Sequence, residues 1–306
     1  MNKTDGDADF VKVIDDLLAH DAGRNSFLRA ILVKLGLQIS SEDYMSHERE
    51  SGKVPTPIHI SSTSELLNRA IYNSLVAIAD NPPARGSNNA FSITAPHDTF
   101  QVRYVHSDLH SLSDDLELLM ASPQSRSIDS VLKNIWFHPI PMEYRYFSPR
   151  LYFEHLASSS TLGRSLAYVK VTTSTQTLLY ENPSLLRCLP HGFVIIATSQ
   201  LNGHGRAGNA WLSPLGILPF TFILRLPQRR YTRLVFITYL FSLAIVEAIR
   251  TYGMGWEDVN VKIKWPNDIY GKSRYADRWE KIGGAMINSI FDENEYILVV
   301  GMTPRY

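Results

Sequence analysis

The second half of the chain alternates short apolar runs with helical segments, and this alternation restricts the possible fold more than any other feature of the sequence. The helix candidates are STQTLLYEN, which opens at Ser174, and the long segment 233–252. The strand candidates are AYVKV (167–171), GFVIIAT (192–198), FTFILRL (220–226), NVKIKW (260–265), GGAMINSIF and YILVVG. Because closely alternating strands and helices usually pack as a sheet with helices on its faces, we expect an α/β sheet domain.

The first half lacks this alternation and is expected to be mainly helical and partly irregular. Residues 9–37 carry apolar side chains at helical spacing. Ser62 and Glu65 have the spacing of a capping box before LLNRAIYNSLVAIA, and a Ser-rich stretch precedes another short helix that ends near Phe137. We therefore predict an N-terminal extension over residues 1–145 and a sheet domain over residues 146–306.

His106 and His110 in this first half are four residues apart, a spacing that on a helix can hold a metal ion. No third ligand accompanies them, so two solvated histidines are the better interpretation. No protein-bound metal is assigned.

Composition excludes several classes of protein. Thirty basic residues balance thirty acidic ones, which argues against nucleic acid or a charged membrane surface as a partner. Cys188 is the only cysteine, which excludes an internal disulfide and a Cys-rich zinc site. The opening MNKTDGDADF is unlike a targeting peptide, and the 13 apolar residues 234–246 are fewer than the about 20 that cross a bilayer. A cytoplasmic protein is expected.

Three glycines in NGHGRAGNAW match the dinucleotide-binding spacing G-x-G-x-x-G. That site needs a helix after the loop and an acidic residue about 20 positions later. Here Pro214 and Pro219 interrupt the following segment, and no Asp or Glu occurs from Asn202 to Val246. A nicotinamide oxidoreductase is therefore rejected. What remains is a loop in which backbone amides and the Arg206 guanidinium can face one anion together.

Two further motifs carry polar groups at strand ends. In KIKWPNDIYG, Lys264 ends a strand before Pro266, where it could neutralise a carboxylate or phosphate; taken singly, a solvated lysine is the better interpretation. Asp268 could support Lys264, hold a magnesium ion or cap the turn. In KIGGAMIN, the paired glycines allow a flat ligand to approach the backbone, or form a bulge.

Taken in order, TTSTQTLL, TSQLNGHGRAGNAWLSP, KWPNDIYG and KIGGAMINS resemble the catalytic domain of biotin protein ligase, also called holocarboxylase synthetase, over roughly residues 145–301. The resemblance implies a mixed β-sheet with flanking helices of the biotin/lipoate ligase type. It also implies formation of biotinoyl-5′-AMP from biotin and ATP with Mg²⁺. Transfer of biotin to a lysine of carboxylase biotin-carrier domains would follow.

The same resemblance assigns roles to individual residues. Arg206 and Lys264 would be catalytic, and would bring the biotin carboxylate and the adenylate phosphate together. The residues implied to line the biotin and biotinoyl-AMP site are Ser174, Thr175, Gln176, Gln200, Gly203, His204, Gly205, Arg206, Trp211, Lys264, Gly283 and Gly284.

Two departures from the family pattern leave alternatives open. The family has further segments after YILVVG, whereas this chain reads MTPRY there, so a C-terminally truncated fragment that only binds a partner is one alternative. A lipoate ligase or octanoyltransferase on a related fold is another. The second departure is His204, which stands where the family has Arg or Lys.

The His204 departure yields a first prediction. Histidine is mostly neutral at pH 7, so the hold on the adenylate should be weaker by about 1–2 kcal/mol than with a fixed cation. His204→Arg should therefore raise the rate of biotin-dependent pyrophosphate release roughly tenfold. Equal rates for the two forms would show that the charge at this position does not matter.

Overall fold

The computed structural model contains two compact units, Met1–Lys53 and Val54–Tyr306, and the residues described all lie in the second. They are residues 55–84, 90–105, 132–205, 210–213, 215–229, 234–272 and 277–303. His106 and His110 fall outside these ranges.

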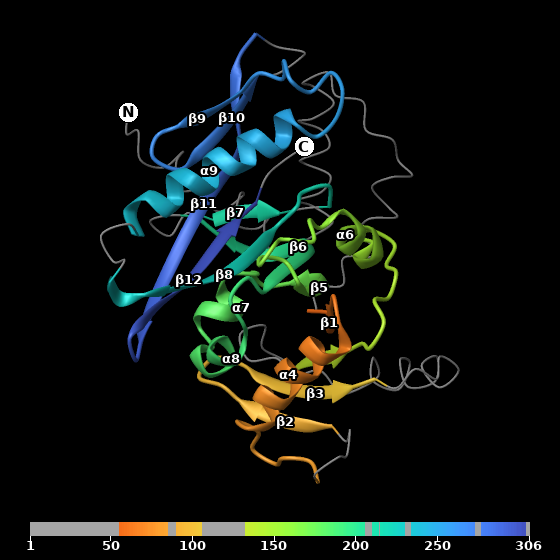
Figure 1. The fold of residues 1–306 in the computed structure, drawn as a ribbon. Helices are drawn as coiled ribbons and strands as arrows, with labels where there is room; N and C mark the ends of the chain where they lie inside the picture. The colour runs from red at the N-terminus through yellow and green to blue at the C-terminus, as the bar shows by residue number, and fades with distance from the viewer. Residues whose placement is uncertain are drawn as a thin grey trace, which may run out of the picture. The chain divides into compact units, whose positions relative to one another are not determined.

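Twelve strands of the described residues form one sheet with the order β2-β3-β4-β1-β5-β6-β8-β12-β11-β10-β9, with β7 paired to β6 (Figure 1). The pairs β1–β4, β3–β4 and β5–β6 are parallel and the others antiparallel. The strands are β1 (Ile58–Ser62), β2 (Phe91–Thr94), β3 (Thr99–Tyr104), β4 (Lys133–Phe137), β5 (Ser165–Thr172), β6 (Val194–His204), β7 (Ala210–Ser213), β8 (Phe220–Pro227), β9 (Val261–Lys264), β10 (Asp268–Lys272), β11 (Trp279–Asp292) and β12 (Glu295–Met302).

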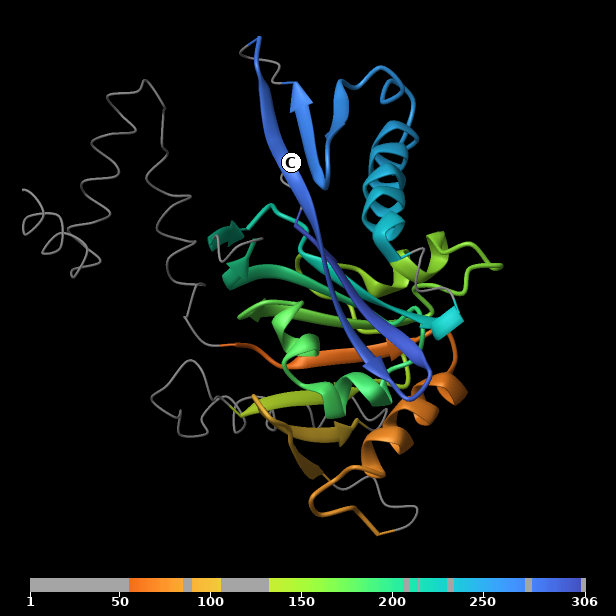
Figure 2. The same ribbon diagram turned by 90° about the vertical axis from the view of Figure 1, so that its left-hand side faces the viewer.

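Helices cover both faces of this sheet (Figures 1 and 2). They are α4 (Glu65–Val76), α6 (Pro149–His155), α7 (Thr177–Tyr180), α8 (Pro183–Cys188) and α9 (Leu234–Arg250). Along β12 the side chains alternate between two cores: Ile297 and Val299 pack with residues of α4, α7 and α8, whereas Leu298 and Val300 pack with residues of α9. This alternation follows from the two-residue period of a strand. No helix in the described part of the chain is both long and apolar enough to cross a membrane.

The strands and helices expected in the second half are confirmed, and the sheet is mixed as the resemblance implied. α7 begins at Thr177 with Gln176 as its N-cap, later than the expected start at Ser174. Ser174 holds the turn before the helix, since its Oγ accepts hydrogen bonds from the N–H groups of Gln176 and Thr177, both at 3.3 Å. The strand expected at 192–198 continues to His204, because its end forms a hairpin with β7.

The described residues before Phe147 differ from the helical expectation, since they contain four strands and one helix. The short helix expected to end near Phe137 is wrong: the segment is β4, whose Ile135 and Phe137 are buried between β1 and β3. The α4 cap is Ser64 rather than Ser62. Ser62 stays extended because it pairs with Ser165 of β5, and its Oγ donates to Ser165 Oγ at 3.0 Å.

The sheet also runs across the expected boundary at residue 145. β1 pairs with β5 over five residues, from Ile58↔Val169 to Ser62↔Ser165. Strands β2 to β4 therefore extend the sheet that the second half forms. Whether residues 1–145 and 146–306 act as separate functional parts stays a prediction.

A pair of histidines, the buried His138 and the partly buried His59, lies beside these strands. His59 of β1 and His138 after β4 form a hydrogen bond of 2.9 Å between Nδ1 and Nε2. Their rings stack, and Tyr144 packs on His59 at a centroid distance of 4.9 Å. Burial lowers the pKa of His59 to about 3, with a smaller contribution from His138, and burial lowers the pKa of His138 to about 4. Both rings are therefore neutral in the folded protein at pH 7.

The lowered pKa values of His59 and His138 predict that the folded protein loses stability in acid. In the unfolded chain a histidine titrates at about 6.5, so the unfolded state binds more protons than the folded state between about pH 6.5 and pH 4. The free energy of unfolding should fall as the pH drops through that window. His138→Gln should reduce the loss between pH 6 and pH 5 by about 1 kcal/mol in urea titrations. The exposed His155 of α6 provides the control His155→Gln. Parallel pH profiles for all three proteins would contradict the prediction.

Candidate functional site

A cavity of about 580 Å³ lies where α7 begins against the ends of β8, β11 and β12. Four segments that are far apart in the sequence contribute to its walls. They carry the motifs singled out above. The lining residues are Ser174, Thr175, Gln176, Gln200, Gly205, Trp211, Thr221, Pro266, Asn267, Asp268, Lys281, Gly284, Ala285, Met286, Gly301, Met302 and Thr303.

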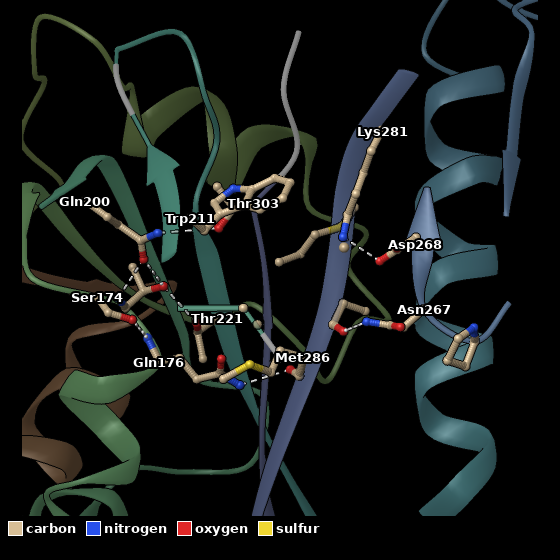
Figure 3. A pocket seen from close by; sticks show the side chains of 17 residues that line it. Ser174, Gln176, Gln200, Trp211, Thr221, Asn267, Asp268, Lys281, Met286 and Thr303 are labelled. Atoms are coloured by element: carbon tan, nitrogen blue, oxygen red, sulfur yellow. Dashed lines mark hydrogen bonds and ion pairs between the residues drawn. The ribbon is translucent and has the colours of Figure 1, made fainter. Parts of the chain in front are cut away.

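One wall is a hydrogen-bonded array of amides and hydroxyls. Gln200 Oε1 accepts from both Thr175 N at 2.9 Å and Thr175 Oγ1 at 3.1 Å, and Gln200 Nε2 donates to Ser213 Oγ at 3.0 Å. Thr221 Oγ1 donates to Thr175 Oγ1 at 2.9 Å. The members are buried and hold one another, so the wall presents oriented donors and acceptors to the cavity (Figure 3).

Gln176 attaches the start of α7 to the sheet. Its Nε2 donates to Met286 O of β11 and to Val299 O of β12, both at 3.0 Å. This arrangement needs glycine at position 301, because a Cβ there would lie 3.2 Å from Gln176 Cδ and 3.0 Å from Thr221 Oγ1. The side-chain amide can therefore lie flat against β12.

The opposite wall carries a cation. Lys281 Nζ pairs with Asp268 Oδ1 at 2.7 Å and lies 5.1 Å from the ring centroid of Trp211 (Figure 3). The pair retains partial exposure, 35% for Lys281 and 25% for Asp268. Asn267 Nδ2 donates to Ala285 O at 2.7 Å and fixes the turn that carries Asp268. An ammonium that faces a cavity in this way is available to an anionic ligand.

The glycine loop forms the tip of the β6–β7 hairpin. Gly203 pairs with Trp211, and His204 with Ala210. A Cβ on Gly203 would lie 2.4 Å from Trp211 O, so the hairpin closes only with glycine there. Gly205 lines the cavity. Arg206 and the side chain of His204 fall outside the part of the chain that the structure describes.

The structure brings most of the sequence-predicted site residues together. Lys264 and Gly283 are not part of the cavity lining. Lys264 ends β9 with an exposed side chain, its Nζ 5.2 Å from the ring centroid of Tyr270. Gly283 pairs with Ile269 of β10. The roles of Lys264 and Gly283 stay predictions. Those at the cavity are Ser174, Thr175, Gln176, Gln200, Gly205, Trp211 and Gly284.

Sequence reasoning passed over Lys281, Thr221 and Thr303 as site residues. Lys281 is the first residue of KIGGAMIN, so attention to the charge beside the paired glycines could have found it. Thr221 is one polar residue inside an apolar strand, and Thr303 follows the last strand. Neither position carries a local signal of its place at the cavity.

The described residues contain no group of three or more His, Cys, Asp or Glu side chains that could hold a metal ion. Asp268 is the acidic residue of the lining, and it already pairs with Lys281. The cavity therefore offers at most one carboxylate to a cation and does not form a metal cage.

Comparison with known proteins agrees with the arrangement of motifs. Residues 168–304 match the model of the Biotin/lipoate A/B protein ligase family. A human biotin–protein ligase is 36% identical over 161 residues, covering 50% of this chain and 20% of the human protein. A Schizosaccharomyces pombe biotin–protein ligase is 31% identical over 216 residues, covering 66% of this chain and 34% of that protein. The solved Aquifex aeolicus biotin protein ligase with biotin and ATP is 26% identical, covers 45% of this chain and 51% of that one, and aligns with a TM-score of 0.35.

The match to this family is confined to residues 168–304, and the mixed β-sheet with flanking helices confirms the expected fold class. The chain is similar to biotin–protein ligases, which confirms the resemblance drawn from the motifs. The chain spans about a fifth to a third of the length of these two relatives.

The close approach at Gly301 yields a stability prediction. In Gly301→Ala the added methyl must displace Gln176 or Thr221, and overpacking of this kind costs about 1–3 kcal/mol. Gly253→Ala is the matched control, because the nearest atom to a Cβ there, in Trp256, lies 3.8 Å away. Urea denaturation should show the loss for Gly301→Ala relative to Gly253→Ala. Equal midpoints would show that the Gln176 contact yields without strain.

Proposed function

We propose that this domain is a biotin–protein ligase that forms biotinoyl-5′-AMP from biotin and ATP and then transfers biotin to a lysine of a biotin-carrier domain. The single observation that carries this proposal is that four motif segments, distant in sequence, line one cavity with a polar wall and a cationic wall. The S. pombe and human relatives, both named biotin–protein ligases, support the same activity.

The polar wall favours biotin over a linear acyl chain. The ureido ring of biotin offers both N–H donors and a carbonyl acceptor, which suit the hydroxyls of Ser174 and Thr175. The amide of Gln200 would join them by exchanging its bond to Ser213 or Thr303 for one to the ligand. A linear acyl chain would leave such groups facing apolar atoms, which costs free energy for each group that loses water. This difference supports biotin within a family that also includes lipoate ligases.

The cationic wall supports the first chemical step. A carboxylate oxygen of biotin attacks the α-phosphorus of ATP, the bond to the leaving pyrophosphate breaks, and negative charge accumulates on the phosphorus oxygens. Lys281 would stabilise that charge from within the cavity. Asp268 holds the ammonium in place, 2.7 Å away, before the substrates bind. Lys264 and Arg206 remain candidates for the same role from the β9 end and from the glycine loop.

The second step needs less from the chain. The acceptor lysine amine attacks the acyl carbon of the adenylate, AMP leaves with the bonding electrons, and the amine loses a proton. The glycine-loop hairpin, which places Gly205 and Trp211 at the cavity, would limit access of water to the labile anhydride. Carboxylase carrier domains as acceptors belong to this proposal.

Magnesium would bind together with ATP. Its phosphates would supply most of the ligands, with Asp268 as one candidate from the chain. No step is assigned to the ion.

The test is ATP-dependent transfer of labelled biotin, or of labelled lipoate, to isolated carrier domains. Lys281→Gln should lower biotin-dependent pyrophosphate release about 100-fold, since a preorganised charge in the cavity is lost. Lys272→Gln is the matched control: Lys272 forms a Lys–Asp pair with Asp277 at 2.5 Å but does not line the cavity. Lys264→Ala, tested alongside, decides whether the exposed lysine also acts.

Each result has a distinct meaning. Transfer of lipoate instead of biotin would identify the other branch of the family. Biotin binding without turnover would favour the binding-only alternative. Equal rates for Lys281→Gln and Lys272→Gln would remove Lys281 from the mechanism.

A further inference from the structure

A buried ion pair lies in the described residues before 168, outside the segment 168–304 that matches the family model. Asp98, in the turn between β2 and β3, contacts Lys133 at the start of β4. Their side chains are 1% and 4% exposed. A pair this deeply buried contributes little net stability compared with apolar residues, although removing one partner alone is costly. Its position in the fold therefore suggests another role.

The pair is joined to Asn182, which follows α7. Asn182 Nδ2 donates to Asp98 Oδ2 at 2.8 Å, and Asp98 N donates to Asn182 Oδ1 at 3.0 Å. Asn182 is fully buried, and its Nδ2 also donates to Leu178 O of α7 at 3.1 Å. One side chain thus connects the turn at Asp98 to the helix that follows the site residues.

Helix α7 depends on such anchors. It has four residues, far fewer than an isolated helix needs to be stable. Its start is held by Ser174, by Gln176 on the sheet, and by the Thr175–Gln200 contact. Its end is held by Asn182. The position of residues 174–176 at the cavity is therefore set from both ends of the helix.

We propose that Asp98 and Lys133 are positioning residues for the ligand cavity, acting through Asn182 and α7 on the turn of residues 174–176. Residues of the predicted N-terminal extension would then be needed for tight ligand binding, even though none of those that the structure describes lines the cavity. The S. pombe match covers 66% of the chain, so it extends well ahead of residue 168, where the family model begins.

The first test compares Asn182→Ala with Asn68→Ala in the full chain. Asn68 is a matched control because it is 1% exposed and its Nδ2 donates to a backbone carbonyl, that of His138, at 2.8 Å, yet it lies in α4 away from the cavity lining. Hydrogen exchange of the α7 amides should become about tenfold faster in Asn182→Ala and stay within about twofold in Asn68→Ala. The Kd for biotin should rise about tenfold in Asn182→Ala alone.

A double-mutant cycle tests whether Asp98 and Lys133 act on α7 through Asn182 or only stabilise their own surroundings. Asp98→Ala combined with Lys133→Met removes both charges together, so no lone buried charge remains. This variant should change exchange and biotin binding in the same direction as Asn182→Ala. Adding Asn182→Ala to it should produce no further effect beyond about twofold.

Two results would overturn the proposal: equal effects of Asn182→Ala and Asn68→Ala, or effects that multiply in the cycle. The binding readout rests on the proposed biotin ligase function, whereas the exchange readout does not. If the parent chain binds no biotin, the proposed function fails, and the α7 amides still decide whether Asp98 and Lys133 position that helix.

Discussion

Backbone hydrogen bonding between β1 and β5 is the interaction on which the rest of the structure depends. It joins the strands of residues 58–137 to the strands of residues 165–302 in one sheet. The core on the α4 side consequently contains side chains from both halves, such as Ile71 and Phe100 together with Leu178 and Val299. A change in the first half can reach α7, since α4, α7 and α8 pack on the same face of the sheet.

The cavity lies where paired strands meet the turn before α7, and side-chain amides fix that turn to the sheet. Gln176 and Gln200 each use a side-chain amide to fix a segment that has little stability of its own. Because these amides are buried, leaving any of their hydrogen bonds unmade is costly, and the wall keeps one arrangement. A ligand that bonds to the Gln200 amide must therefore replace one of the hydrogen bonds that this amide already makes.

Two Lys–Asp pairs illustrate how burial separates structural from chemical roles. Lys133–Asp98 is almost completely buried, so exchange of either partner would leave an uncompensated charge, and the pair is suited to holding elements together. Lys281–Asp268 keeps a quarter to a third of its surface exposed at the cavity. Because both side chains are partly solvated, weakening the contact between Lys281 and Asp268 costs little free energy, so a phosphate or carboxylate of a ligand can also bind Lys281. The same two residue types thus support different functions.

The sequence by itself determined the sheet domain of the second half, the similarity to biotin protein ligases, and most of one cavity wall, because strand periodicity and motif spacing are local properties. Ser174, Thr175, Gln176 and Gln200 belong to such motifs. Tertiary structure alone decided that Ile135 and Phe137 belong to a strand, that Ser62 pairs with Ser165, and that Thr221 and Lys281 face the cavity. The physical reason is that these outcomes depend on which strand lies beside which, and pairing partners more than 70 residues apart leave no periodic signal in either segment.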